Sequence, residues 1–153
     1  KNREPLTITD PEMTRFMMSL EDSVELVIHA FNKGKSGEIF IRKSPATNLN
    51  ILATAMRKIY KIDNGMKIIG TRHGEKLYET LISREESLRT KEEKHFYRIY
   101  NDDRDLNYNL FFSQGKKTKK VFEYNSHNTF QLDEKKLIKL LKSNILKEDE
   151  FDA

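Results

Sequence analysis

Short apolar runs alternate with helical patterns between residues 6 and 79, and this alternation constrains the fold more than any other feature. Apolar side chains at residues 20–31 and 49–59 recur at the spacing of amphipathic helices with a face turned to a core. The intervening runs with strand character are residues 6–9, 38–42 and 66–70. Strands that alternate with helices indicate the α/β class.

Local signals agree with this reading. Ser19 can cap the first helix, and Thr47 or Asn48 can cap the second, because their side-chain oxygens accept from the first backbone N–H groups. Asp133 can cap a last helix in the same way. The predicted inner faces of the three helices are Leu20, Val24, Val27, Ile28 and Phe31, then Leu49, Leu52, Ala53, Met56 and Ile59, and finally Leu137, Ile138, Leu140, Leu141 and Ile145.

The chain changes character after Ser83. Residues 84–94 are highly charged and are predicted to be helical, whereas residues 95–108 are aromatic and charged without a clear period. A basic run at residues 116–120 is predicted to be a solvated loop rather than a nucleic-acid contact. Residues 121–124 are a strand candidate.

Composition excludes several classes of function. Of the 153 residues, 37% are hydrophobic and 34% charged, and no apolar run approaches the length needed to span a membrane. A net charge of +4 is too modest to indicate a nucleic-acid-binding protein. The absence of cysteine removes disulfides, thiolate zinc sites and cysteine nucleophiles, and it fits a reducing compartment, so we expect a cytoplasmic protein.

The segment from Gly70 to Glu79 leaves the end of the third strand-like run. The guanidinium of Arg72 can bind a phosphate in a fork of hydrogen bonds, and the carboxylate of Glu75 can accept from ribose hydroxyls. Loops at strand ends are where open α/β folds bind ligands. From these residues alone, however, a solvated surface ion pair is favoured over a nucleotide site.

Other polar candidates are weaker. Arg15 lies in an apolar, strand-like segment, where an anion ligand and an edge-strand charge are equally supported. Lys43 follows another strand-like run and could face the same site. The four histidines lack the spacing of metal ligands, and none is assigned a catalytic role; His29 is expected to be half-buried on its helix, and His73 lies in the Gly70–Glu79 segment.

Four segments together form a more specific pattern: residues 6–18, 70–79, 104–108 and 123–129. They resemble the extended short-chain dehydrogenase/reductase enzymes that modify UDP-sugars, in particular the 4-epimerase and 4,6-dehydratase branch of capsular polysaccharide and lipopolysaccharide synthesis. The resemblance covers nearly the whole chain. It implies an α/β fold that is the C-terminal, substrate-binding lobe of such an enzyme, without the N-terminal Rossmann core that binds the dinucleotide.

The resemblance also implies residue roles. Arg15 corresponds to an arginine that contacts the UDP diphosphate, Arg72 to a second phosphate-binding arginine, and Glu75 to the acid that holds the uridine ribose. It implies a UDP-sugar lobe at residues 1–84 and a family-specific extension with a terminal helix at residues 85–153. Two arginines on one diphosphate are physically reasonable, since each contact is charge-assisted.

The motifs for catalysis in that family are missing. No two of the six glycines are spaced as Gly-x-Gly, and no tyrosine is followed by lysine four positions later. The parent enzyme would bind NAD or NADP through its other half, and this chain alone would bind no cofactor and would lack catalytic residues. Its expected partners are a UDP-sugar and either a Rossmann half or a further copy of the chain, but neither nucleic acid nor membrane.

Two alternatives stay open at this point. The chain could be a stand-alone module that binds a UDP-sugar or a partner, or, with less support, a small basic nucleic-acid-binding domain. As an isolated lobe it would expose apolar faces that pack on the missing half, which predicts association or marginal stability. The expected faces include Phe16, Met17, Met18, Ile39 and Ile41.

Overall fold

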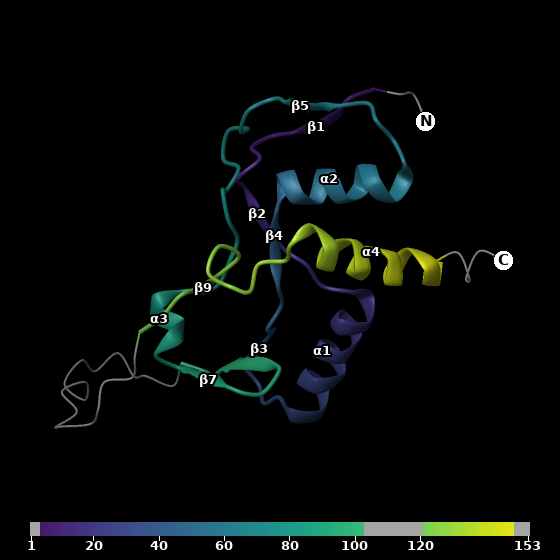
Figure 1. Ribbon diagram of the computed structural model, residues 1–153. Coiled ribbons are helices and arrows are strands. Elements are labelled where there is room, and N and C mark those ends of the chain that lie inside the picture. Colours follow the sequence, from purple (N-terminus) through teal and green to yellow (C-terminus); the bar gives the residue numbers. More distant parts are fainter. Residues whose placement is uncertain (1–3, 103–120, 149–153) are drawn as a thin grey trace. The chain divides into compact units, whose positions relative to one another are not determined.

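The computed structural model describes residues 4–102 and 121–148 and is a mixed α/β structure (Figure 1). The described residues form two compact units that interleave along the chain. The first contains residues 4–20, 44–80 and 125–148, and the second contains the others. The expected α/β class, with short strands alternating with helices, is confirmed. The functional division at residue 84 stays a prediction, because compactness does not report function.

Helices α2 (Leu49–Tyr60) and α4 (Glu134–Glu148) form the core of the first unit. Asn48 caps α2 by accepting a hydrogen bond from the Ile51 N–H at 2.8 Å, and Asp133 accepts from the Lys136 N–H at 2.8 Å before α4. Both caps were predicted from the sequence and are confirmed.

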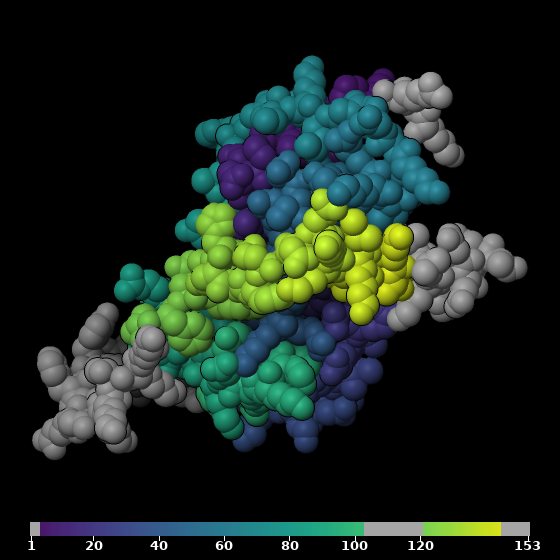
Figure 2. Space-filling model, viewed as in Figure 1, coloured from purple at the N-terminus to yellow at the C-terminus, as the bar shows by residue number. Residues whose placement is uncertain are grey.

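The two helices pack through small and branched side chains. Ala55 and Leu137 are fully buried, and Leu132 joins them in the cluster. Figure 2 shows the yellow α4 segment lying against α2 on this face. Partly buried apolar residues complete the cluster: Met17, Ile51, Leu52, Ile138, Leu140 and Leu141. Full burial of a large apolar side chain such as Leu137 is worth about 1.5–3 kcal/mol.

Two strand pairs place the loops of the first unit. Strand β1 (Leu6–Ile8) pairs in parallel with β5 (Met66–Ile68), and β2 (Thr14–Phe16) pairs antiparallel with β4 (Ala46–Asn48). After β5 the chain turns through Gly70 and Gly74, whose φ angles of 81° and 77° suit glycine. This geometry brings the Gly70–Glu79 segment back toward β2.

The second unit is built on a three-stranded sheet with the order β3-β8-β7. Its strands are β3 (Ile39–Arg42), β8 (Phe96–Ile99) and β7 (Thr90–Glu92), and both pairings are antiparallel. Helix α1 (Leu20–Lys33) packs on this sheet through His29, which stacks on Phe96 at 4.1 Å and meets Phe40 edge-on. His29 is half-buried, as expected.

Two sequence predictions about the second unit are wrong. The apolar stripe of α1 does not face a core of the described residues: Leu20, Val24, Val27, Ile28 and Phe31 are 50–88% exposed, and α1 contacts the sheet through its other side. The spacing of apolar residues along a helix predicts that one face will be covered, but it does not say which part of the protein or which partner covers that face. Residues 84–94 were predicted to be helical, but only the single turn α3 (Arg84–Ser87) is helical. The chain then enters strand β7, in which Thr90 is buried.

The remaining strands lie where the chain passes between units: β6 (Thr80–Ile82) and β9 (Tyr124–Asn125). The strand expected at residues 121–124 is thus present only at its end. The predicted basic loop at 116–120, the family-like segment at 104–108 and the end of the chain lie outside the described residues. Within the described part of the chain, no helix is both long and apolar enough to cross a membrane.

Candidate functional site

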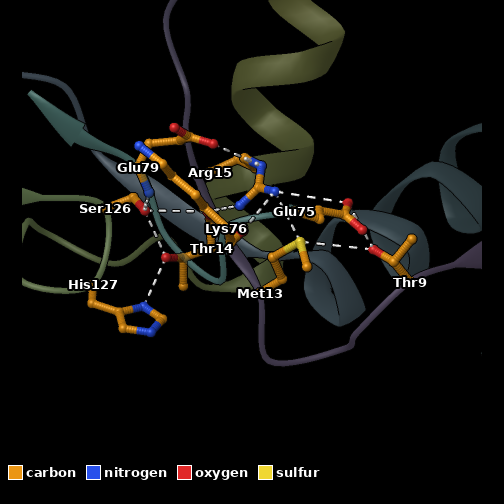
Figure 3. Close-up of polar contacts among 9 residues, drawn as sticks. All are labelled: Thr9, Met13, Thr14, Arg15, Glu75, Lys76, Glu79, Ser126 and His127. Carbon is orange, nitrogen blue, oxygen red and sulfur yellow. Dashed lines mark hydrogen bonds and ion pairs between the residues drawn. The ribbon is translucent and has the colours of Figure 1, made fainter. Parts of the chain in front are cut away.

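Arg15 is the centre of a polar cluster in the first unit (Figure 3). It projects from β2, where its backbone pairs with Thr47 of β4, and its side chain is 26% exposed. The guanidinium donates through Nη1 to the Thr14 carbonyl at 2.7 Å and through Nη2 to the Lys76 carbonyl at 3.0 Å. The Gly70–Glu79 segment therefore holds Arg15 at a partly dry position, where a charge-assisted contact is stronger than in water.

Glu75 lies beside Arg15, as the resemblance implies. Its Oε1 is 4.0 Å from Arg15 Nη2 and accepts a hydrogen bond from the Thr9 hydroxyl at 3.2 Å. Its Oε2 accepts from the Arg72 backbone N–H at 3.1 Å, and its own N–H donates to the Arg72 carbonyl at 3.1 Å. Contacts from two segments thus fix this carboxylate.

Arg72 joins the cluster through its backbone. Its side chain lies at the exposed surface, and the ion pairs among the described residues do not include it. Long exposed arginines reorient at little energetic cost, so the guanidinium can turn toward a bound anion. The convergence of two guanidinium groups on one ligand stays a prediction.

Sequence reasoning missed Glu79 as a neighbour of Arg15. Its Oε1 lies 3.7 Å from Arg15 Nε, and its side chain is 45% exposed. Arg15 therefore lies between two carboxylates, a half-buried one at residue 75 and a more exposed one at residue 79. The only signal in the sequence was its position at the end of the Gly70–Glu79 segment.

A network of hydrogen bonds through two hydroxyl groups connects the backbone next to Arg15 with the backbone of Glu79. Ser126 Oγ donates to the Thr14 carbonyl at 3.1 Å, so it must accept from the Glu79 N–H at 3.0 Å and from the Thr14 hydroxyl at 2.7 Å. The Thr14 hydroxyl, having given its proton, accepts from His127 Nδ1–H at 2.7 Å. This assignment satisfies all four contacts and fixes the tautomer of a histidine whose ring lies 4.8 Å from Tyr78.

Other candidates lie elsewhere. Lys43 belongs to the second unit, where it pairs with Glu92 at 2.6 Å. His73 is exposed. A search of the residues that the structure describes found no group of three or more His, Cys, Asp or Glu that could hold a metal ion. The Arg15 cluster places a half-buried guanidinium between two carboxylates, an arrangement that can bind an anion beside a hydroxyl-bearing group.

Comparisons with known proteins show which family the chain resembles. A family model described as "Polysaccharide biosynthesis protein" matches residues 1–101, and one described as "Polysaccharide biosynthesis protein C-terminal" matches residues 102–145. The X-ray structure of Pen from Bacillus thuringiensis resembles the chain with a TM-score of 0.76 and 32% identity, covering 95% of this chain and 42% of that one.

Curated relatives include proteins named UDP-glucose 4-epimerase. The one from Rickettsia felis is 49% identical over 142 residues, and the ones from Rickettsia rickettsii and Rickettsia bellii are each 48% identical over 142 residues. Each match covers 92% of this chain and 42% of the relative. The chain thus spans about two fifths of the length of the curated relatives that it matches.

Proposed function

Because the chain belongs to the polysaccharide biosynthesis protein family, we propose that it is the UDP-sugar-binding part of a nucleotide-sugar 4-epimerase or 4,6-dehydratase. In this proposal Arg15 and Arg72 bind the diphosphate, and Glu75 accepts hydrogen bonds from the uridine ribose. The parent reaction serves capsular polysaccharide or lipopolysaccharide synthesis in the cytoplasm. It requires a Rossmann half, supplied by another segment or chain, and we expect the protein partner of this chain to be either that half or a further copy of the chain.

One observation carries the proposal: Arg15 and Glu75 come from segments far apart in the sequence and lie within 4.0 Å of each other. Glu75 is held by Thr9 and by the Arg72 backbone, so it does not depend on Arg15 for its position. A fixed carboxylate beside a half-buried guanidinium matches the two ends of a nucleoside diphosphate, hydroxyl groups and phosphate oxygens.

The residues that the structure describes do not fit a nicotinamide dinucleotide. A site for its pyrophosphate needs a glycine-rich turn between a strand and the N-terminus of a helix. The glycines in the described ranges lie instead between a helix and the next strand, or between β5 and β6: Gly34, Gly37, Gly65, Gly70 and Gly74. We therefore assign NAD or NADP to the other half of the parent enzyme and no catalytic step to this chain alone.

Calorimetric titration with UDP tests the proposal. Replacing Arg15 by alanine should weaken UDP binding by about 1.5–3 kcal/mol, because a hydrogen bond to a charged group is lost at a partly buried position. Glu75→Gln should weaken it as well. Arg84→Ala, which removes an exposed arginine of the second unit, is the matched control and should leave the affinity unchanged. Equal affinity of the wild type and Arg15→Ala, or no UDP binding at all, would overturn the assignment.

A further inference from the structure

We propose that Glu79 is a built-in competitor for the anion-binding site: its carboxylate holds Arg15 in the ligand-free state and must leave before a diphosphate can bind. The inference rests on the proposed function, since it takes Arg15 as a phosphate ligand. It assigns to Glu79 an effect on affinity opposite to that of Glu75, although both carboxylates lie beside the same guanidinium.

The geometry around Arg15 places Glu79 where a ligand oxygen would bind. In Figure 3 the guanidinium lies between the two carboxylates, with Glu79 Oε1 3.7 Å from Nε on one side and Glu75 on the other. Carboxylate and phosphate oxygens accept from the same guanidinium N–H groups in the same geometry. A phosphate that approaches Arg15 from the Glu79 side therefore replaces this carboxylate.

The backbone keeps Glu79 within reach of Arg15. Ser126 is fully buried; its N–H donates to the Glu79 carbonyl at 2.8 Å, and its hydroxyl accepts from the Glu79 N–H. The same hydroxyl donates to the carbonyl of Thr14, the residue before Arg15. One buried serine thus ties the backbone of Glu79 to that of Thr14, next to Arg15, so the fold keeps the two opposite charges within reach of each other.

The side chain of Glu79 is nevertheless able to leave. It is 45% exposed, compared with 25% for Glu75, and its carboxylate can turn into water without breaking either backbone hydrogen bond to Ser126. Glu75 differs because Thr9 and the Arg72 N–H hold its carboxylate in place. Glu75 can therefore stay and contact a ligand, whereas Glu79 leaves and its negative charge opposes the incoming phosphate.

Titration of the full chain with UDP tests this difference. Glu79→Gln should bind UDP about two- to fivefold more tightly than the wild type at low salt, since a partly exposed ion pair no longer has to be broken. The gain should shrink at high salt, where surface charges are screened. Glu12→Gln removes an exposed carboxylate of the same unit and controls for net charge; it should change the affinity much less. Circular dichroism and Glu79→Ala check that the effect is not a folding artefact.

Inorganic pyrophosphate, which lacks the ribose, separates the two glutamates. Glu79→Gln should tighten the binding of pyrophosphate and UDP alike, whereas Glu75→Gln should weaken UDP relative to pyrophosphate. Unchanged or weaker UDP binding by Glu79→Gln, with Arg15→Ala still defective, would overturn this inference and leave the proposed function standing. No UDP binding by either the wild type or Glu79→Gln would overturn both.

Discussion

At the scale of single residues, Ser126 connects two segments of the first unit. Its hydroxyl and its N–H bind Thr14 and Glu79, which belong to separate segments of the first unit, and its side chain has no access to water. A buried hydroxyl that joins two backbone segments stabilises the native state mainly because its removal takes a partner from each buried polar group that it contacts.

Replacing Ser126 by alanine should therefore lower the free energy of unfolding by about 1–3 kcal/mol, because the Thr14 carbonyl and the Glu79 N–H lose a partner. Urea denaturation followed by circular dichroism measures this loss. Ser143→Ala, which removes an exposed hydroxyl on α4, is the control and should change stability by less than about 0.5 kcal/mol. Equal stability of both variants would contradict the assigned role.

The residues of the site were only partly predictable. Arg15 and Glu75 were identified because the segments around them resemble a known family, and the structure brings these two side chains together. Ser126 and Glu79 were not, since their contacts depend on loops that meet across long stretches of chain; Ser126 and Thr14 are 112 positions apart. A small polar residue in a loop carries no sign of such a partner in the local sequence.

At the scale of elements, local capping chemistry was the most predictable part. Asn48 and Asp133 cap their helices as expected because the cap involves only neighbouring residues. Amphipathic spacing was less informative: the α2 face is buried in part, whereas the similar stripe on α1 is exposed. The prediction of a helix over residues 84–94 was wrong, because a high content of charged residues is compatible both with a long helix and with one helical turn followed by a strand.

Helix α3 gives a prediction about pH. Ser83 and Glu86 form a capping box, and the hydrogen bond from the Ser83 backbone, followed by that from its side chain, lowers the pKa of Glu86. A depressed pKa in the folded state adds stability that is present above the unfolded pKa and is lost as pH falls through the folded value.

Glu86→Gln should therefore lose less stability than the wild type when the pH is lowered from neutral into the acidic range. Urea denaturation midpoints at a series of pH values measure the difference. Glu85→Gln is the matched control, because this exposed neighbour in α3 is not the capping-box partner. Parallel pH curves for the wild type and Glu86→Gln would refute the prediction.

At the scale of the whole molecule, the sequence predicted only part of the exposed apolar surface correctly. Met18 and Ile39 are exposed as expected, but Ile41 is buried, and Phe16 and Met17 are half-buried. The larger exposed surface is the α1 stripe, where Phe31 is 88% exposed. Contiguous apolar side chains at a surface favour association.

The isolated chain should therefore associate as its concentration rises, and Val27→Glu combined with Phe31→Glu should reduce this association. Sedimentation velocity over a range of concentrations measures it. Leu88→Glu, which adds a charge at an exposed apolar residue outside α1, is the control and should have a smaller effect. A wild-type chain that remains monomeric at all concentrations would show that the stripe does not drive self-contact.

The interleaving of the first unit has a consequence for how the protein forms. The unit needs three separated stretches of chain, and the last of them supplies Ser126, which joins Thr14 to Glu79. Closing loops of this length costs entropy before the contacts repay it, so such structures form late and slowly. During synthesis Arg15 and Glu75 would emerge before residues 125–148, so the link between Thr14 and Glu79 through Ser126 would form only when that stretch follows. Formation of the Ser126 contacts can therefore serve as a marker that folding of the first unit is complete.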